Sequence, residues 1–149
     1  MDLPSVDVRW EQRFQNFSRA FKLLREAVED KDIEQLSQLE QEGVIQRFEY
    51  TFELAWKTLK DYLEYSGVEF RDKTPRGVIK ECNGCGIFAE AGIDGDIYLN
   101  MMLARNLLSH TYDFETFREI ISELKALYYP QLEKQYLFLL KKSIPSLGR

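Results

Sequence analysis

The stretch GVIQRFEYTFELAWKTLKDYLEYSG, residues 43–67, decides the fold class. Its apolar residues recur every three or four positions, which is the spacing of one face of an α-helix. Gly67 follows the last of them, and glycine commonly ends helices. The stretch therefore predicts one helix of about two dozen residues, whose apolar face includes Phe48, Phe52, Leu59 and Leu63.

Helical patterns continue upstream. Apolar residues from Trp10 to Val28 step by four, three, four, three and four positions, opposite a charged face, so an amphipathic helix is predicted there. Residues 29–42 are polar and acidic, and we interpret them as a connection that contains a short helical turn.

Three more helices are predicted downstream. Thr74-Pro75 supplies an N-cap and a first helical residue for a helix that Gly84 and Gly86 end. A helix that includes residues 97–108 follows, and Asp113 caps a last one that Pro130 should kink or break. Its inward residues are expected to be Phe117, Ile120, Ile121, Leu124, Leu127 and Tyr128, and the pattern resumes at Leu132 and runs to Lys141-Lys142.

Together these elements predict an all-α fold: an antiparallel up-and-down four-helix bundle with a fifth, extra helix, in one domain of residues 1–149. The helix over 97–108 is apolar nearly all round, with Ile97, Met101 and Ala104 on one face and Leu99, Leu103 and Leu107 on another. Such a helix needs burial on two sides, so we expect a homodimer built around it.

Composition excludes several classes of protein. The net charge of −5 and the pI near 5.0 argue against a broad nucleic-acid surface, so any nucleic-acid contact must be local. No signal-peptide pattern and no apolar run of ~18 residues occurs, which predicts a cytoplasmic protein without membrane contact. Cys82 and Cys85 lack the further ligands of a zinc site, so we expect incidental thiols, with no metal and no cofactor.

The candidate site is Arg105-Asn106-Leu107-Leu108-Ser109-His110-Thr111-Tyr112, which holds the only histidine of the chain. An imidazole, a permanent cation and a phenol together suit the handling of a phosphodiester. At about 100° per residue, a regular helix would set Arg105 and His110 about 140° apart and Arg105 and Tyr112 nearly eclipsed. Unless the helix unwinds near Ser109, one copy cannot direct both Arg105 and His110 at one phosphate, whereas two copies across a two-fold axis can.

Two other groups of side chains, one basic and one acidic, each allow more than one interpretation. Arg71, Lys73, Arg76 and Lys80 face only Asp72, so this basic segment either receives an RNA or nucleotide phosphate at a helix start or is simply solvated. Glu49 and Glu53 share a stripe of their helix and could bind a metal or act as acid and base; otherwise they are solvated or pair with Arg47 and Lys57.

Arg105, His110 and Tyr112 match the Arg-x4-His-x-Tyr motif of HEPN domains, with Asn106 in the usual polar position. Residues 46–60 and 74–81 resemble the HEPN branch of nucleotidyltransferase substrate-binding proteins, which includes the HepT-like toxins, and the resemblance runs from about Trp10 to Tyr128. Cys82 and Cys85 are not part of the family pattern.

The resemblance implies an all-helical dimer partnered with a small, separately encoded nucleotidyltransferase of the MNT type, often as toxin and antitoxin. It further implies a metal-independent ribonuclease in which His110 is general acid or base, Arg105 stabilises phosphate charge and Asn106 orients the site. The partner would attach AMP to Tyr112 and so block the cleft. The alternatives are a non-catalytic substrate- or nucleotide-binding subunit that uses the same cleft and the basic segment, and a dimeric scaffold.

Overall fold

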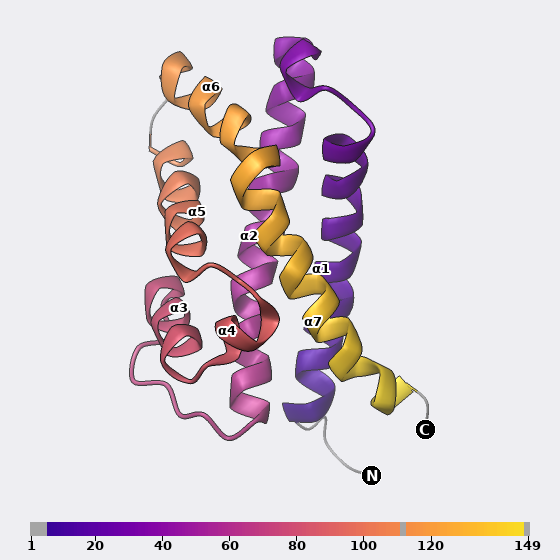
Figure 1. Cartoon of the computed structure of the whole chain (residues 1–149), viewed down its shortest axis with the longest axis vertical. Coiled ribbons are helices and arrows are strands. Elements are labelled where there is room, and N and C mark those ends of the chain that lie inside the picture. Colours follow the sequence, from indigo (N-terminus) through magenta and orange to yellow (C-terminus); the bar gives the residue numbers. More distant parts are fainter. Residues whose placement is uncertain (1–5, 111–112, 148–149) are drawn as a thin grey trace.

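The computed structural model describes residues 6–110 and 113–147 of the chain, and within these ranges every regular element is a helix (Figure 1). The all-α prediction is therefore confirmed. None of the described helices is long and apolar enough to cross a membrane. In chain order the elements are α1 (Val6–Glu29), the 3₁₀ turn η1 (Ile33–Gln35), α2 (Gln38–Tyr65), α3 (Pro75–Gly84), α4 (Ile87–Ala91), α5 (Gly95–Leu108), α6 (Phe114–Glu123), the π-helical turn η2 (Leu124–Tyr128) and α7 (Tyr129–Leu147).

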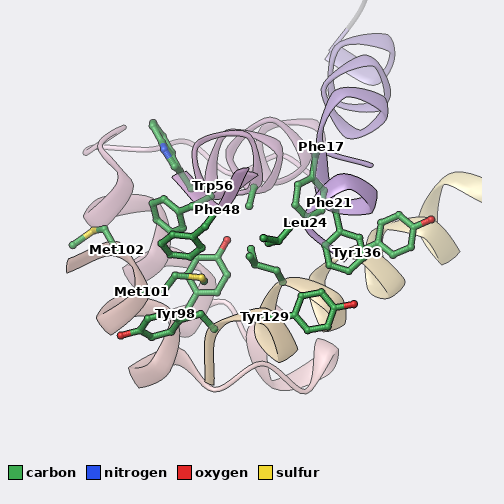
Figure 2. Packing of buried hydrophobic residues seen from close by; sticks show 14 of the residues in the cluster. Phe17, Phe21, Leu24, Phe48, Trp56, Tyr98, Met101, Met102, Tyr129 and Tyr136 are labelled. Carbon is green, nitrogen blue, oxygen red and sulfur yellow. The ribbon is translucent and has the colours of Figure 1, made fainter. Parts of the chain in front are cut away.

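The helices α1 and α2 form an antiparallel hairpin, and α7 crosses it (Figure 1). Rings from α1 fill the space under α7: Phe21 stacks on Tyr136 with ring centroids 4.8 Å apart, and on Tyr129 at 5.5 Å (Figure 2). Aromatic pairs of this kind add to the stability that comes from their buried area. All six apolar positions predicted for the first helix are buried: Trp10, Phe14, Phe17, Phe21, Leu24 and Val28.

The helix α2 begins five residues earlier than the sequence pattern predicted, at Gln38 instead of Gly43. Ser37 is its N-cap and forms a capping box with Glu40: the Ser37 hydroxyl accepts from the Glu40 N–H at 3.2 Å, and the Glu40 carboxylate accepts from the Ser37 N–H at 3.1 Å. These two hydrogen bonds satisfy backbone donors that a helix start otherwise leaves unpaired. The capping box stabilises the first turn of α2, which has no buried apolar side chain and so left no mark in the apolar spacing.

The helices α3 and α5 pack on α2, and α4 lies against α3 and α7 (Figure 1). The predicted cap of α3 is confirmed, since the Thr74 hydroxyl accepts from the Gly77 N–H at 3.2 Å. The short α4 was not predicted; it follows Gly86, which adopts a left-handed φ of 87°, and it buries Phe88 in the core. The α5 residue Tyr98 is fully buried beside it (Figure 2).

The chain from α6 to α7 runs as one long irregular helix, as expected, but the irregularity lies before Pro130 and not at it. Residues 124–128 form a π-helical turn, and Pro130, which has no N–H to donate to the preceding turn, follows it as the second residue of α7. The wide turn lets the Tyr128 hydroxyl donate to Glu123 at 2.7 Å. Leu127, predicted to face inward, is instead 39% exposed because the wider turn displaces it from the buried stripe.

A buried ion pair joins α1 to α2. The Asp61 carboxylate, 1% exposed, accepts from the Arg13 Nε at 2.9 Å, and the Lys60 ammonium lies 3.4 Å from its second oxygen. Removal of either cation would leave this buried carboxylate with less compensation.

Candidate functional site

The helix α5 ends two residues before the histidine. Asp94 caps its start by accepting from the N–H groups of residues 96 and 97, and the last helical residue is Leu108. The N–H groups of Ser109 and His110 then donate to carbonyls three residues back, which tightens the final turn. Asn106 and His110 are exposed at this end, and Tyr112 lies outside the described residues.

The end of α5 does not remove the predicted separation. Ser109 keeps right-handed helical dihedrals, and the His110 N–H still donates to the carbonyl three residues back, so the backbone does not unwind between Arg105 and His110. The angle of about 140° that a regular helix sets between these residues therefore still argues against one copy directing both side chains at one phosphate. The predicted eclipsing of Arg105 and Tyr112 falls outside the described residues.

The Arg105 side chain is held against the middle of α2. Its Nη2 lies 3.0 Å from Oε2 of Glu53, and both side chains are about one-third exposed. The same Glu53 oxygen accepts from the Trp56 indole N–H at 3.2 Å, while Lys57 lies 3.2 Å from the other oxygen. The Arg105 Nε is buried and has no hydrogen-bond partner among the described residues. Glu53 therefore orients the guanidinium through Nη2, while Nε still lacks a hydrogen-bond partner among the described residues.

The two carboxylates of the α2 stripe differ in their environments. Burial disfavours the charge of Glu53, but the hydrogen bonds from Trp56 and Lys57 and the charge of Arg105 outweigh it and lower its pKa. Burial raises the pKa of Glu49, and the nearby Arg105 offsets that rise only in part. Of the alternatives left open for this stripe, the Glu53–Lys57 pair is present.

The alternative in which Arg47 pairs with a carboxylate is not found among the described residues. Arg47 instead donates to the backbone carbonyl of Leu23 at 2.8 Å, which ties α2 to α1. Among the described residues no group of three acidic, histidine or cysteine side chains is close enough to hold a metal ion.

The basic segment 71–80 lies apart from Arg105. Lys73 pairs with Glu64 at 3.4 Å, whereas Arg105 pairs with Glu53. Those two α2 residues are separated by about 16 Å along the helix, at 1.5 Å per residue. Arg71, Arg76 and Lys80 are exposed. The structure thus brings the basic segment to a different part of α2 from the candidate catalytic residues.

The two cysteines are free thiols, Cys82 buried and Cys85 exposed. Burial raises the pKa of Cys82 well above its ordinary value, so this thiol stays protonated and is a poor nucleophile or metal ligand.

The outer face of α5 is uncovered in the described chain. Leu103 and Leu107 are 44% and 45% exposed, while Tyr98 and Met101 on the inner face are fully buried (Figure 2). A groove of about 300 Å³ runs between this outer face and α6. Apolar side chains on an exposed strip are typical of a surface that another chain covers.

Sequence reasoning did not identify a pocket between the start of α2 and the junction of α5 with α6. Its volume is about 390 Å³, and Leu108 and Asp113, which bracket the histidine in sequence, both line it. Its remaining lining residues come from α2 and α6, so no local motif could reveal it.

Fold and site together define a class: an all-helical bundle with a half-buried arginine in the last turn of one helix and an exposed histidine just beyond that helix. The chain belongs to the family described as nucleotidyltransferase substrate binding protein like, whose model matches residues 12–141. A crystal structure of a protein from Thermus thermophilus is similar, with 35% sequence identity and a TM-score of 0.65, and the match covers 81% of this chain and 95% of that chain. A search of curated proteins gives no match.

Proposed function

We propose that this chain is a metal-independent endoribonuclease that acts as the toxin of a toxin–antitoxin pair. The observation that supports this most is the exposed His110 just beyond α5, five residues from an arginine that Glu53 orients. A base and a phosphate-binding cation are the groups that cleavage of an RNA strand needs.

The reaction needs no group from outside the protein and its substrate. His110 takes the proton of a ribose 2′-hydroxyl, the resulting oxygen attacks the adjacent phosphorus, and the bond to the 5′-oxygen breaks. A protonated imidazole returns a proton to that 5′-oxygen, so the products are a 2′,3′-cyclic phosphate and a 5′-hydroxyl. Arg105 stabilises the charge that develops on the phosphate, and Asn106 orients the site.

A homodimer fits the two proton transfers, because each chain carries a single histidine. One copy can then supply the base and the other the acid. The exposed strip of α5 that includes Leu103 supports this assembly. We expect Leu103→Glu to shift the protein toward monomer in sedimentation and to reduce cleavage, while Leu39→Glu, at a 78% exposed position, changes neither. A wild-type protein that sediments as a monomer at micromolar concentration would remove the dimer from the proposal.

The proposed partner is a small nucleotidyltransferase, as the family description suggests for its members. It would attach AMP to Tyr112, two residues from His110, and the added anion would compete with RNA for Arg105. Incubation with the enzyme encoded by a neighbouring gene and ATP should add one AMP mass to the wild type and none to Tyr112→Phe.

The decisive experiment incubates purified protein with single-stranded RNA in excess EDTA. Cleavage by the wild type and its loss in His110→Ala and Arg105→Ala, with both variants folded and unchanged in oligomeric state, is the expected result. Arg19→Ala, an exposed arginine on α1, is the matched control and should cut at the wild-type rate. Wild-type protein that cuts no RNA class, or a His110→Ala variant that cuts normally, contradicts the proposal.

A second candidate is a non-catalytic subunit that binds substrate or nucleotide for the nucleotidyltransferase. The family description favours it, as do the net charge of −5 and the Glu53 carboxylate that already occupies Arg105. In that case the exposed basic segment Arg71, Lys73, Arg76 and Lys80 would contact a phosphate of the nucleotide. Absence of cleavage, together with partner binding that depends on nucleotide and weakens in Arg76→Ala, would establish this function in place of the first.

A further inference from the structure

The pocket between the start of α2 and the junction of α5 with α6 has a lining that suits a flat, polar ligand better than a phosphate. Of its nine lining residues none is lysine or arginine, and three are acidic, so a phosphate would be repelled. Its apolar surface comes from Ile45, Leu108 and the ring of Phe117. Its volume of about 390 Å³ lies in the range of small-molecule sites, about 300 to 1,000 Å³.

An exposed ring stands at the start of α6. Phe114 also lines the pocket and is 51% exposed, even though the Arg118 guanidinium lies 4.9 Å from its ring centroid. Exposed aromatic rings of this kind are the surfaces on which proteins stack unpaired bases, and a neighbouring arginine adds to the stacking.

Two polar side chains of α2 project into the same pocket. Gln46 and Glu49 are three residues apart and therefore share a helix face. Glu49 is partly buried, and it has no ion pair or hydrogen bond with another described residue. A partly buried carboxylate in this position gains from a ligand that offers it hydrogen-bond donors.

We propose that this pocket holds one unpaired nucleobase of the RNA and prefers guanine. Guanine presents its N1–H and its 2-amino group side by side, so both can donate to the two oxygens of Glu49, and its O6 can accept from the Gln46 amide. Adenine and cytosine offer one amino donor next to a ring acceptor. Uracil places carbonyl oxygens on both sides of its single donor, and these repel the carboxylate.

The pocket reaches the end of α5, where Leu108 lines it, and the cap of α6, where Asp113 lines it. Arg105 is close enough to Glu49 to affect its ionisation. A base bound at Glu49 would bring its own phosphate toward the end of α5. The inference rests on the proposed ribonuclease for its effect on cleavage, but base binding itself is independent of catalysis.

The test uses a set of single-stranded RNA oligonucleotides that are identical except for one position, which carries each of the four bases in turn. Wild-type kcat/KM should be about tenfold higher at guanine than at uracil, because a bidentate base contact is worth about that factor. Glu49→Gln should reduce this ratio to near one, and Phe114→Ala should lower kcat/KM about tenfold for every base. Glu69→Gln, an exposed loop position, is the matched control and should keep the wild-type ratio.

A second measurement keeps the inference separate from the ribonuclease. Equilibrium dialysis with guanosine and uridine 5′-monophosphates should show tighter binding of the guanosine nucleotide by the wild type and equal binding by Glu49→Gln. Equal binding of the two nucleotides by the wild type overturns the inference, whether or not RNA is cut. Cleavage that ignores the variable base also overturns it and leaves the ribonuclease standing. A Phe114→Ala variant that changes only the sedimentation behaviour would make the pocket an interface between copies and would equally overturn it.

Discussion

Two arginine–carboxylate pairs tie α2 to other helices, and they differ in burial and not in bond length. Arg13 reaches Asp61 at 2.9 Å, and Arg105 reaches Glu53 at 3.0 Å. Asp61 is 1% exposed, whereas Glu53 is 30% exposed. Each carboxylate also has a lysine of α2 within 3.4 Å.

The difference shows how the same chemical pair can serve the fold in one place and a site in another. A carboxylate cut off from water depends on its cation, so loss of the cation leaves an expensive buried charge. A pair that water still reaches contributes only about 0 to 1 kcal/mol to stability. The Arg105–Glu53 pair therefore contributes little to folding stability. Its effect is to orient the guanidinium, which can then bind a ligand.

The largest difference between the pairs should appear when Arg105 is changed to Ala. We expect the cleavage rate to fall about 100- to 1,000-fold, the usual effect of removing one charge-stabilising donor, while the free energy of unfolding changes by less than about 1 kcal/mol. Single-turnover cleavage and urea unfolding check the two values. A variant that loses activity only because it unfolds would erase the contrast.

The matching change at the buried pair, Arg13→Ala, should give the opposite result. Asp61 would keep only Lys60, and we expect the free energy of unfolding to fall by about 2 kcal/mol. For a chain of this size the melting temperature would fall by about 4 to 8 °C. The cleavage rate below the transition should match the wild type; a large loss there would mean that both pairs serve the site.

Glu53→Gln should have a smaller effect that sharpens the role of the exposed pair. The amide can still accept from Trp56 but holds Arg105 less firmly, so we expect cleavage to slow about tenfold through kcat, with KM little changed. Glu53→Asp, which retains the charge, should recover part of the loss. An increase in activity would show that Glu53 restrains Arg105 and does not position it.

The smallest effect concerns pH and Glu49. Because its folded pKa lies above the ordinary value of 4.5, the folded state binds more protons than the unfolded state between those two values. Its favourable contribution is present below pH 4.5 and is lost as the pH rises through the folded value. The Glu49→Gln variant does not titrate at this position and should not lose this stability. Its free energy of unfolding in urea, relative to wild type, should therefore increase as the pH rises from 4.5 through the folded pKa of Glu49. A constant difference would show that Glu49 is not desolvated.

Much of the fold follows from helical periodicity, because the spacing of Trp10, Phe14 and Phe17 reports burial directly. The start of α2 was missed because the capping box of Ser37 and Glu40 works through polar hydrogen bonds and not through apolar spacing. The short α4 was missed because its five residues are too few to show a period.

The candidate site was predictable as residue types but not as contacts. The motif places Arg105 and His110 in the sequence, yet the Glu53 contact joins residues 52 positions apart and depends on how α5 packs on α2. The end of α5 at Leu108 agrees with the predicted helix over residues 97–108.

The π-helical turn at Leu124–Tyr128 has a consequence for chain length among relatives. A π turn accommodates one residue more than the α-helical turn it replaces. Deleting one residue there would restore a regular helix and leave both flanking faces in register with the core. Length changes in this half of the molecule should therefore fall inside a helix as single-residue gaps near positions 124–128, instead of collecting in the loops where insertions and deletions are usually tolerated.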